Sequence, residues 1–208
     1  MQKIYHRINT PAQLSEVPTH AGIELDIRYH ENQLVLHHDP FRHHEEPAPI
    51  AFEEFLKSWQ HQGTMILNIK TEGVEQECLR LMEKYKIQNW FFLDLSMPYF
   101  ALYAEHAANK TFLNFSPDNL AVRFSEREAL EYALGFKGKA RWVWVDCFTH
   151  MPLTAENARA LKTAGFQICL VSPELQKHDI SRISEFKQQL QKDQIHIDAV
   201  CTKHPDLW

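Results

Sequence analysis

Residues 22–28 read Gly-Ile-Glu-Leu-Asp-Ile-Arg, a run in which apolar and charged side chains alternate. Such a run predicts a β-strand, because successive side chains along a strand point to opposite faces. Other short runs, bounded by turn residues, predict strands at residues 3–6, 33–38, 65–70, 90–96, 111–115, 141–148, 167–171 and 199–202. Apolar residues at three- and four-residue spacing predict helices at residues 52–61, 74–85, 99–108, 125–134, 154–164 and 181–193.

This alternation of strands and helices predicts the fold class. Strands separated by helices are typical of βα units around a parallel sheet, and the number of units is close to eight. We therefore expect an α/β protein, a single-domain (β/α)8 TIM barrel over residues 1–208, at the small end of a range centred at about 250 residues. Only residues 7–21 join the first two strands, so the first helix should be short or missing.

The composition limits the class of protein. With 44% hydrophobic and 24% charged residues, the 208-residue chain is an ordinary folded protein and not a disordered one. The net charge of −5 provides no general attraction to a nucleic acid or to an anionic membrane surface. The four cysteines are widely spaced without a Cys-x-x-Cys pair, and we expect them to be reduced core residues.

Nothing in the sequence predicts a membrane segment. Lys3, His6 and Arg7 interrupt the region where a signal peptide needs an apolar stretch, and no eighteen apolar residues are consecutive. No amphipathic run of the kind that anchors proteins to membranes is found either. These features predict a cytoplasmic protein.

Catalytic groups of a TIM barrel project from the carboxyl ends of its strands, so polar residues at those ends are the candidate site residues. In this chain they are rich in acids and imidazoles: His6, Arg7, Glu24, Asp26, His38, Asp39, Asn68, Lys70, Asp94, Asn114, Asp146 and Lys203.

Glu24 and Asp26 are two residues apart on one predicted strand, so both carboxylates should face the barrel lumen. Two carboxylates in a lumen of low dielectric constant repel each other unless a cation neutralises them, and Mg²⁺ or Ca²⁺ prefers such oxygen ligands. Asn68 could add an amide oxygen to the metal site, and Lys70, on the same face, could pair with a phosphate. The alternative is a reversed strand, with both acids in solvent.

The chain has 13 histidines, and an imidazole can serve as acid or base near neutral pH. His6 and His38 follow neighbouring predicted strands and could act as such a pair, with Arg7 holding a phosphate oxygen. The remaining histidines near these positions are interpreted as surface or packed side chains, namely His37, His43, His44 and His61.

Several motifs occur in a familiar order: His6-Arg7, Glu24-x-Asp26, Leu-Val-Leu-x-His-Asp at residues 34–39, and Ile69-Lys70. Together with the closing segment at residues 198–207, they resemble the glycerophosphodiester phosphodiesterase family, a phosphatidylinositol-phospholipase-C-like barrel. The resemblance implies a (β/α)8 barrel that hydrolyses phosphodiesters with one divalent cation, Mg²⁺ or Ca²⁺. It also implies that His6 and His38 are acid and base and that Glu24 and Asp26 bind the metal.

This chain departs from the family pattern at four places. Ile8 replaces the usual Gly after His-Arg, Asn68 replaces a metal-binding Glu, and Lys203 replaces an Asp, while the Glu-Asn-Thr motif and its helix after strand one are missing. We expect a metal-dependent phosphodiesterase that hydrolyses a small glycerophosphodiester-like molecule. The alternative is a catalytically impaired barrel that binds a phosphorylated ligand or a protein partner; an enzyme acting at a membrane is a third hypothesis.

Overall fold

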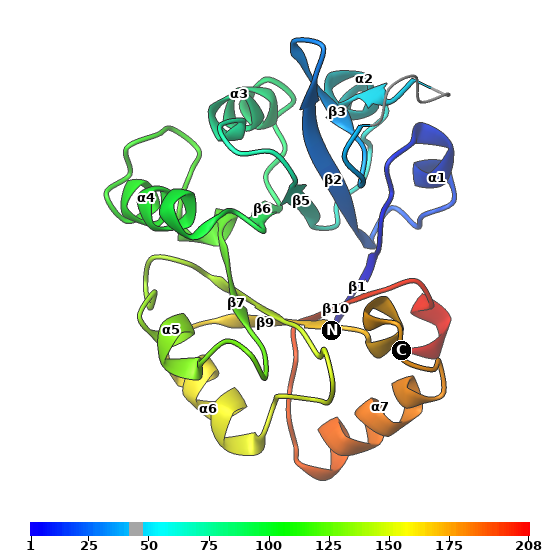
Figure 1. The fold of residues 1–208 in the computed structure, drawn as a ribbon, viewed down its shortest axis with the longest axis vertical. Helices are drawn as coiled ribbons and strands as arrows, with labels where there is room; N and C mark the ends of the chain where they lie inside the picture. The colour runs from blue at the N-terminus through cyan, green and yellow to red at the C-terminus, as the bar shows by residue number, and fades with distance from the viewer. Residues whose placement is uncertain (42–47) are drawn as a thin grey trace.

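The computed structural model describes residues 1–41 and 48–208, and its core is a ring of parallel strands (Figure 1). Neighbouring strands pair in the order β6-β5-β2-β1-β10-β9-β8-β7, and a parallel bridge between Phe92 and Leu120 joins β6 to the start of β7. The predicted eight-stranded barrel is therefore confirmed. Its strands are β1 (Gln2–Tyr5), β2 (Gly22–His30), β5 (Met65–Ile69), β6 (Trp90–Leu93), β7 (Ala121–Phe124), β8 (Trp142–Val145), β9 (Gln167–Val171) and β10 (Ala199–Thr202).

Helices lie outside the ring of strands (Figure 1). The first, α1 (Pro11–Ser15), has only five residues, which confirms the prediction of a short first helix. Thr10 caps it, because its side chain accepts a hydrogen bond from the Gln13 backbone N–H. The others are α2 (Phe52–Lys57), α3 (Glu75–Lys84), α4 (Met97–Ala108), α5 (Leu130–Leu134), α6 (Ala155–Thr163) and α7 (Arg182–Lys192), with 3₁₀ turns at η1 (Pro117–Asn119), η2 (Pro173–Gln176) and η3 (Pro205–Leu207).

The strand predicted at residues 33–38 forms, but outside the barrel. It is β3 (Gln33–Leu36), which pairs antiparallel with β2, and β4 (Ile50–Ala51) pairs antiparallel with β3. Glu31 and Asn32 have φ values of 46° and 64°, as a tight hairpin turn requires. This hairpin returns the chain to the carboxyl half of β2, where the His37 backbone N–H donates to the Asp26 carbonyl at 3.0 Å.

The prediction of a strand at residues 111–115 is wrong. The chain turns there, with Lys110 and Asn114 at φ values of 53° and 59°, and the barrel strand is β7, ten residues later. The aromatic residues that suggested a strand pack on Tyr103 of α4 instead, with ring centroids 6.1 Å away for Phe112 and 5.8 Å for Phe115. The helix predicted at residues 125–134 is likewise shortened to α5, because Ser125 and Glu128 pair in a turn before it.

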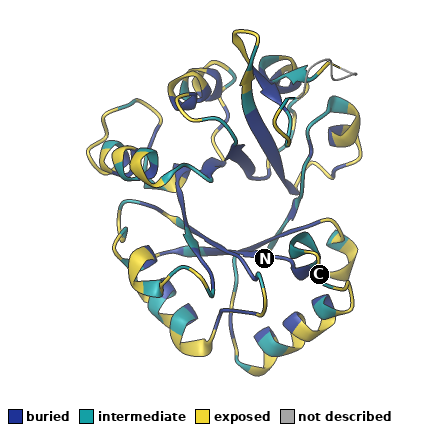
Figure 2. Ribbon diagram, viewed as in Figure 1, coloured by how far each residue is buried: buried dark blue, intermediate teal, exposed yellow. Residues whose placement is uncertain are grey.

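Alternation along the strands produces two apolar clusters, one inside the barrel and one between strands and helices. Figure 2 shows the strands mostly buried and the outer faces of the helices exposed. Ile23, Leu25 and Ile27 belong to the outer cluster, so Glu24 and Asp26 occupy the other face of β2, as the alternation predicts. All four cysteines are buried and free, namely Cys78, Cys147, Cys169 and Cys201.

No helix within residues 1–41 and 48–208 combines the length and the apolarity needed to cross a membrane. The cytoplasmic location stays a prediction.

Candidate active site

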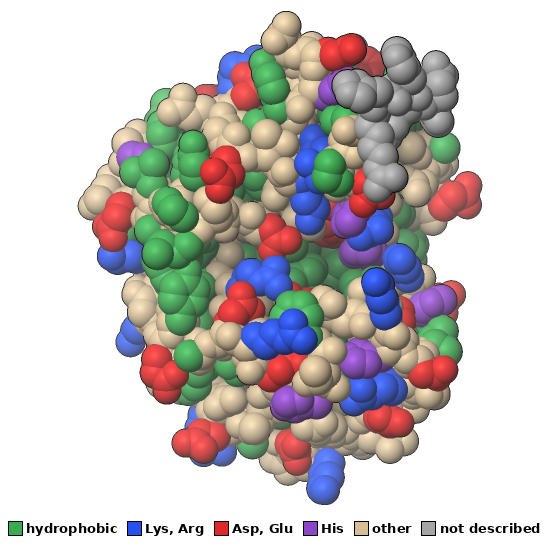
Figure 3. Space-filling view, viewed as in Figure 1, with side chains coloured by type: hydrophobic (Ala, Val, Ile, Leu, Met, Phe, Trp, Pro, Cys, Tyr) green, Lys and Arg blue, Asp and Glu red, His purple; other side chains and the backbone are tan. Residues whose placement is uncertain are grey.

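Charged and histidine side chains gather over the middle of the ring of strands in Figure 3. The carboxyl ends of β1, β2 and β5, together with the segment after β3, bring most of the predicted site residues to this end of the barrel. Their contacts define the first side of the barrel mouth, hereafter the β1–β2–β5 side: His6, Arg7, Glu24, Asp26, His38, Asp39, Asn68 and Lys70.

Glu24 is fully buried and hydrogen-bonded at both oxygens. Its Oε1 accepts from Asn68 Nδ2 at 2.7 Å, its Oε2 accepts from the Arg7 backbone N–H at 2.9 Å, and His6 Nε2 lies 3.7 Å from Oε2. Burial, reinforced by the charge of neighbouring Asp26, raises the pKa of Glu24 to about 7, although the bonds from Asn68 and Arg7 act in the opposite direction. A buried carboxyl of this kind calls for a positive charge beside it.

Asp26 is also fully buried, and it is held mainly by Asn9. Asn9 Nδ2 donates to Asp26 Oδ2, and the Asp26 backbone N–H donates back to Asn9 Oδ1, both at 2.9 Å. Lys70 Nζ lies 3.6 Å from Asp26 Oδ1. Asn9 is not among the predicted site residues, although the dipeptide Asn9-Thr10 matches the last two residues of the Glu-Asn-Thr motif.

Arg7 links the two histidines. It has a φ of 57°, a left-handed conformation that costs a bulky residue about 1 kcal/mol or more. In this conformation its backbone faces Glu24 while its Nη2 donates to His38 Nε2. Since arginine can only donate, His38 Nε2 is the acceptor, and the ring proton is on Nδ1, which donates to Asp39 Oδ1 at 2.8 Å. His38 is therefore a neutral imidazole oriented by a carboxylate.

His6 is a second neutral imidazole. Its side chain is only 14% exposed, and burial, followed by the positive charges of Arg7 and Lys203 and by His38 and Lys70, lowers its pKa to about 3. The pKa of Asp39 is also lowered, but by the hydrogen bond from His38 and not by burial. His6 Nδ1 has no hydrogen-bond partner, whereas the lone pair of His38 Nε2 accepts from Arg7.

The β1–β2–β5 side contains four buried polar atoms without a hydrogen-bond partner: His6 Nδ1, Arg7 Nε, Asp26 Oδ1 and Asn68 Oδ1. Buried polar atoms are nearly always paired, so their concentration here fits a place that binds a ligand or an ion. Two of the four are oxygens beside Glu24, which suits a hard divalent cation that keeps several water ligands. Within the described ranges no three His, Cys, Asp or Glu side chains are arranged to hold a metal ion by themselves, so such a cation would also depend on the Asn68 amide oxygen.

The predicted second-tier acids Asp94 and Asp146 belong to a different cluster, on the β6–β7–β8 side of the mouth. Arg123 of β7 donates to both carboxylates and lies 3.0 Å from Glu128 Oε1. These three carboxylates outweigh the effect of burial and raise the pKa of Arg123, whereas burial raises the pKa of Asp146. Lys70 Nζ, 3.5 Å from Asp94 Oδ2, connects the two sides. Arg123 is not among the predicted site residues, because the strand expected at residues 111–115 forms instead as β7.

Lys203 lies on the other flank of His6. The parallel register of β1 and β10 pairs Tyr5 with Thr202, so His6 and Lys203 are the next pair along the two strands. The Lys203 backbone N–H donates to Glu174 Oε1 at 3.0 Å, and this same oxygen accepts from Thr202 Oγ1 at 2.6 Å. The Lys203 side chain is exposed at the mouth.

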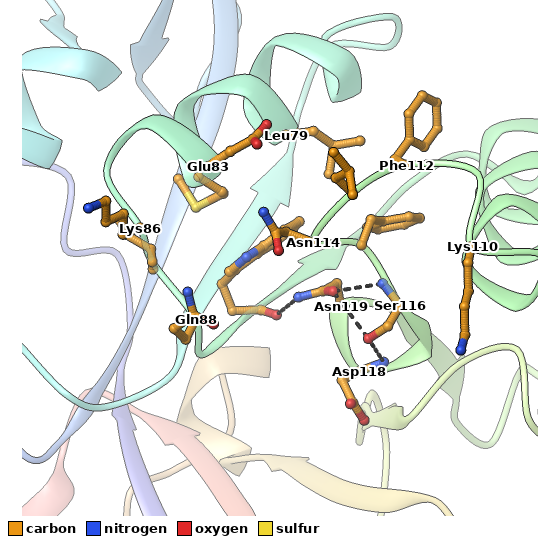
Figure 4. A pocket seen from close by; sticks show the side chains of 15 residues that line it. Leu79, Glu83, Lys86, Gln88, Lys110, Phe112, Asn114, Ser116, Asp118 and Asn119 are labelled. Atoms are coloured by element: carbon orange, nitrogen blue, oxygen red, sulfur yellow. Dashed lines mark hydrogen bonds between the residues drawn. The ribbon is translucent and has the colours of Figure 1, made fainter.

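Asn114 does not belong to the site, so its prediction is wrong. It lies in the turn before β7, at the opposite end of the barrel, where it lines a cavity of about 500 Å³ beside Trp90 and Asn119 (Figure 4). The misplaced strand at residues 111–115 caused this error. His37 bonds to the Asp39 carbonyl and His61 stacks on Trp59, while His43 and His44 lie outside the described residues.

No protein-family model and no curated protein matches the sequence. Solved structures do match the fold. A glycerophosphodiester phosphodiesterase from Agrobacterium tumefaciens str. C58 superposes with a TM-score of 0.64 and 15% identity, covering 100% of this chain and 99% of that one. The chain shares its fold with this enzyme.

Two further solved structures show how general that fold is. A glycerophosphoryl diester phosphodiesterase from Parabacteroides distasonis ATCC 8503 gives a TM-score of 0.65 and 13% identity over 99% of this chain and 84% of that one. Tryptophan synthase subunit alpha from Campylobacter jejuni gives 0.57 and 11% identity over 97% and 85%. At these identities the likeness concerns the barrel and leaves the activity to be argued from the site.

Proposed function

We propose that this protein is a phosphodiesterase that uses one divalent cation, Mg²⁺ or Ca²⁺, to hydrolyse a small glycerophosphodiester-like molecule. The observation that carries the proposal is the convergence of His6, Arg7, Glu24, Asp26 and His38 at the carboxyl ends of the barrel strands, with four buried polar atoms unpartnered among them and their neighbours. The barrels of two solved phosphodiesterases support it at the level of fold.

Glu24, Asp26 and the Asn68 amide oxygen are the groups that would hold the cation, and they fit one because two of their buried oxygens, Asp26 Oδ1 and Asn68 Oδ1, have no hydrogen-bond partner. When bound, a divalent cation supplies positive charge that polarises a phosphoryl oxygen. Asn9 keeps the Asp26 carboxylate oriented toward this place through its two hydrogen bonds. Lys70, 3.6 Å from Asp26, balances part of the negative charge of the pair and can contact the phosphate.

His38 is suited to the role of general base. Its Nε2 carries a lone pair, and Asp39 at Nδ1 would stabilise the imidazolium that forms when His38 takes a proton from water or from a substrate hydroxyl. The new bond to phosphorus forms from that oxygen while the ester bond to the leaving oxygen breaks. Arg7, which contacts His38, can donate to a phosphate oxygen and offset the developing charge.

His6 is the partner acid in this proposal. Without substrate, burial and surrounding positive charges keep its pKa near 3. A bound phosphodiester anion would offset the charges of Arg7, Lys203 and Lys70 and would raise that pKa, so that His6 can carry the proton that the leaving oxygen needs.

The test is hydrolysis of a panel of glycerophosphodiesters and of nucleoside and sugar phosphodiesters with Mg²⁺, Ca²⁺ or Mn²⁺, each repeated with EDTA. We expect metal-dependent turnover of at least one glycerophosphodiester and its loss in His38→Ala. Turnover that survives EDTA would contradict the cation, and turnover that survives His38→Ala would contradict the proposed base.

The second candidate is a barrel that binds a phosphorylated ligand or a protein partner without turnover. It is favoured by Asn68, whose amide donates to Glu24 where the family places a third acid. Phosphate-ester binding by calorimetry, with no hydrolysis on the whole panel, would establish this candidate in place of the enzyme.

A further inference from the structure

The positive charges around His6 are not all compensated by the protein. Lys70 is shared between Asp26 and Asp94. Lys203, in contrast, has no carboxylate oxygen within 4.0 Å of its Nζ among the described residues. An ammonium group close to the proposed site without a protein carboxylate beside it is available to an anionic ligand.

The position of Lys203 is built into the fold. On β10, Ala199 and Cys201 belong to the apolar cluster inside the barrel, so alternation directs the next residue of this series, Lys203, toward the mouth. Glu174 holds its backbone, and Ser172 and Thr202 in turn donate to the Glu174 carboxylate. The positive charge of Lys203 also acts on His6, because Lys203 is among the groups that lower the His6 pKa.

Lys203 and the carboxylate pair lie on opposite flanks of His6. In the ring of strands β10 neighbours β1 on one side and β2 neighbours it on the other, which gives the order Lys203, His6, Glu24 across the mouth. A phosphate placed beside Glu24 and Asp26, with His6 at one of its ester oxygens, would send the substituent on that oxygen past His6 toward Lys203.

We propose that the substrate is a phosphodiester whose substituent carries a second anionic group, a carboxylate or a phosphate, and that Lys203 binds this group. This inference rests on the proposed function, and it names the substrate class of the same site. An ion pair at an accessible position contributes modestly, so the preference for the second anion should be about three- to tenfold in kcat/KM.

The test uses two probes that differ by one carboxylate, glycerophosphoserine and glycerophosphoethanolamine. We expect the wild-type protein to hydrolyse the serine diester with the higher kcat/KM. Lys203→Ala should lower the ratio of the two kcat/KM values, serine diester over ethanolamine diester, about three- to tenfold, and Lys203→Glu should reverse the preference. Lys203→Arg should keep it, and Lys192→Ala, which removes an exposed lysine at the end of α7, should behave as wild type.

Two results would overturn the inference. An equal loss on both diesters in Lys203→Ala would place Lys203 on the scissile phosphate, and no loss on either would show that it binds neither group. If the wild-type protein hydrolyses neither probe nor any other diester of the panel, the proposed function fails instead. Calorimetric binding of the same two probes to wild type and Lys203→Ala then tests the second anion by itself, and equal affinities would reject it.

Discussion

On the β1–β2–β5 side of the barrel mouth, buried polar atoms of His6, Arg7, Asp26 and Asn68 have no hydrogen-bond partner. On the β6–β7–β8 side, none of the described side chains of the Arg123 cluster has a buried atom without a partner. Asp146, for example, accepts from Trp144 Nε1 at 3.1 Å and from Gln176 Nε2 at 2.8 Å besides Arg123.

Both sides have acids and bases at the ends of parallel strands, so residue type alone does not distinguish them. The two sides differ in whether their buried polar atoms have hydrogen-bond partners. A fully paired network stabilises the structure and leaves nothing for a ligand, whereas unpaired buried groups cost free energy and persist where function requires them. These observations support the proposal that the first side is the catalytic one and that the second has a structural role.

The largest expected effect separates the two sides by activity. His6→Ala and His38→Ala should each lower the rate of hydrolysis by about 100- to 10,000-fold, because each removes a proton-transfer group. The melting temperature should change little for His38, whose side chain is 36% exposed. Initial rates and circular dichroism melting curves measure the two quantities. Unchanged rates in both variants would contradict a catalytic role for the β1–β2–β5 side.

The next effect separates the sides by stability. Arg123→Ala leaves the 2%-exposed Asp146 without its counter-ion and leaves Asp94 with Lys70 alone, so the free energy of unfolding should fall by about 3 kcal/mol, the low end for a broken buried pair. The matched control is Arg80→Ala, which breaks an exposed pair with Glu77 and should cost less than about 1 kcal/mol. Equal losses in the two variants by urea denaturation would show that the Arg123 cluster is not structural.

A third prediction concerns pH and the buried charge of Glu24. Its pKa is about 7 in the folded protein and about 4.5 when unfolded, so the folded state gains from the proton below pH 4.5 and loses that gain as pH rises toward 7. Without divalent cation, Glu24→Gln should therefore be more stable than wild type at pH 8, by on the order of 1–3 kcal/mol, with little difference at pH 4.5.

Thermal melts across this pH range in EDTA measure the effect, and Glu83→Gln, an exposed change on α3, serves as the control. If wild type and Glu24→Gln keep a constant difference in melting temperature from pH 4.5 to 8, burial does not raise the pKa of Glu24.

The smallest effect concerns Asn68. Asn68→Glu adds a third carboxylate beside Glu24 and Asp26, and it should strengthen Mg²⁺ or Ca²⁺ binding about tenfold, because ligand charge sets the affinity for these ions. The same change should lower the melting temperature in EDTA, since the added charge then has no counter-ion. Calorimetric titration of the metal checks the affinity, and a weaker or unchanged affinity would place the cation elsewhere.

The sequence predicted the β1–β2–β5 side well because its information is local. Glu24 and Asp26 alternate with apolar residues, which fixes their face, and His6, His38, Asn68 and Lys70 occupy the ends of short apolar runs. Asn9 was missed because its contact with Asp26 spans 17 positions of the chain and forms only when the loop folds onto β2.

The β6–β7–β8 side was predicted poorly for a physical reason. A pattern of apolar residues reports which side chains are buried but not what buries them, so Phe112 and Phe115, packed on a helix, were taken for a strand. The barrel strand β7 has Arg123 on its inner face. The Arg123 charge is balanced there by Asp94 and Asp146, which follow the strands on either side of β7. The sequence of a single segment does not show that charges from neighbouring strands will pair.

The most direct test of the assignment is a ³¹P NMR time course with glycerophosphodiester substrate and Mg²⁺ or Ca²⁺, recorded for wild type, His38→Ala and Arg127→Ala. Arg127, stacked on Phe148, is the control for loss of a polar side chain outside the β1–β2–β5 side. We predict conversion of the diester resonance to a phosphomonoester by wild type and Arg127→Ala, and none by His38→Ala or after EDTA. A diester resonance that persists with wild type under every metal would contradict the assignment of catalysis to this barrel.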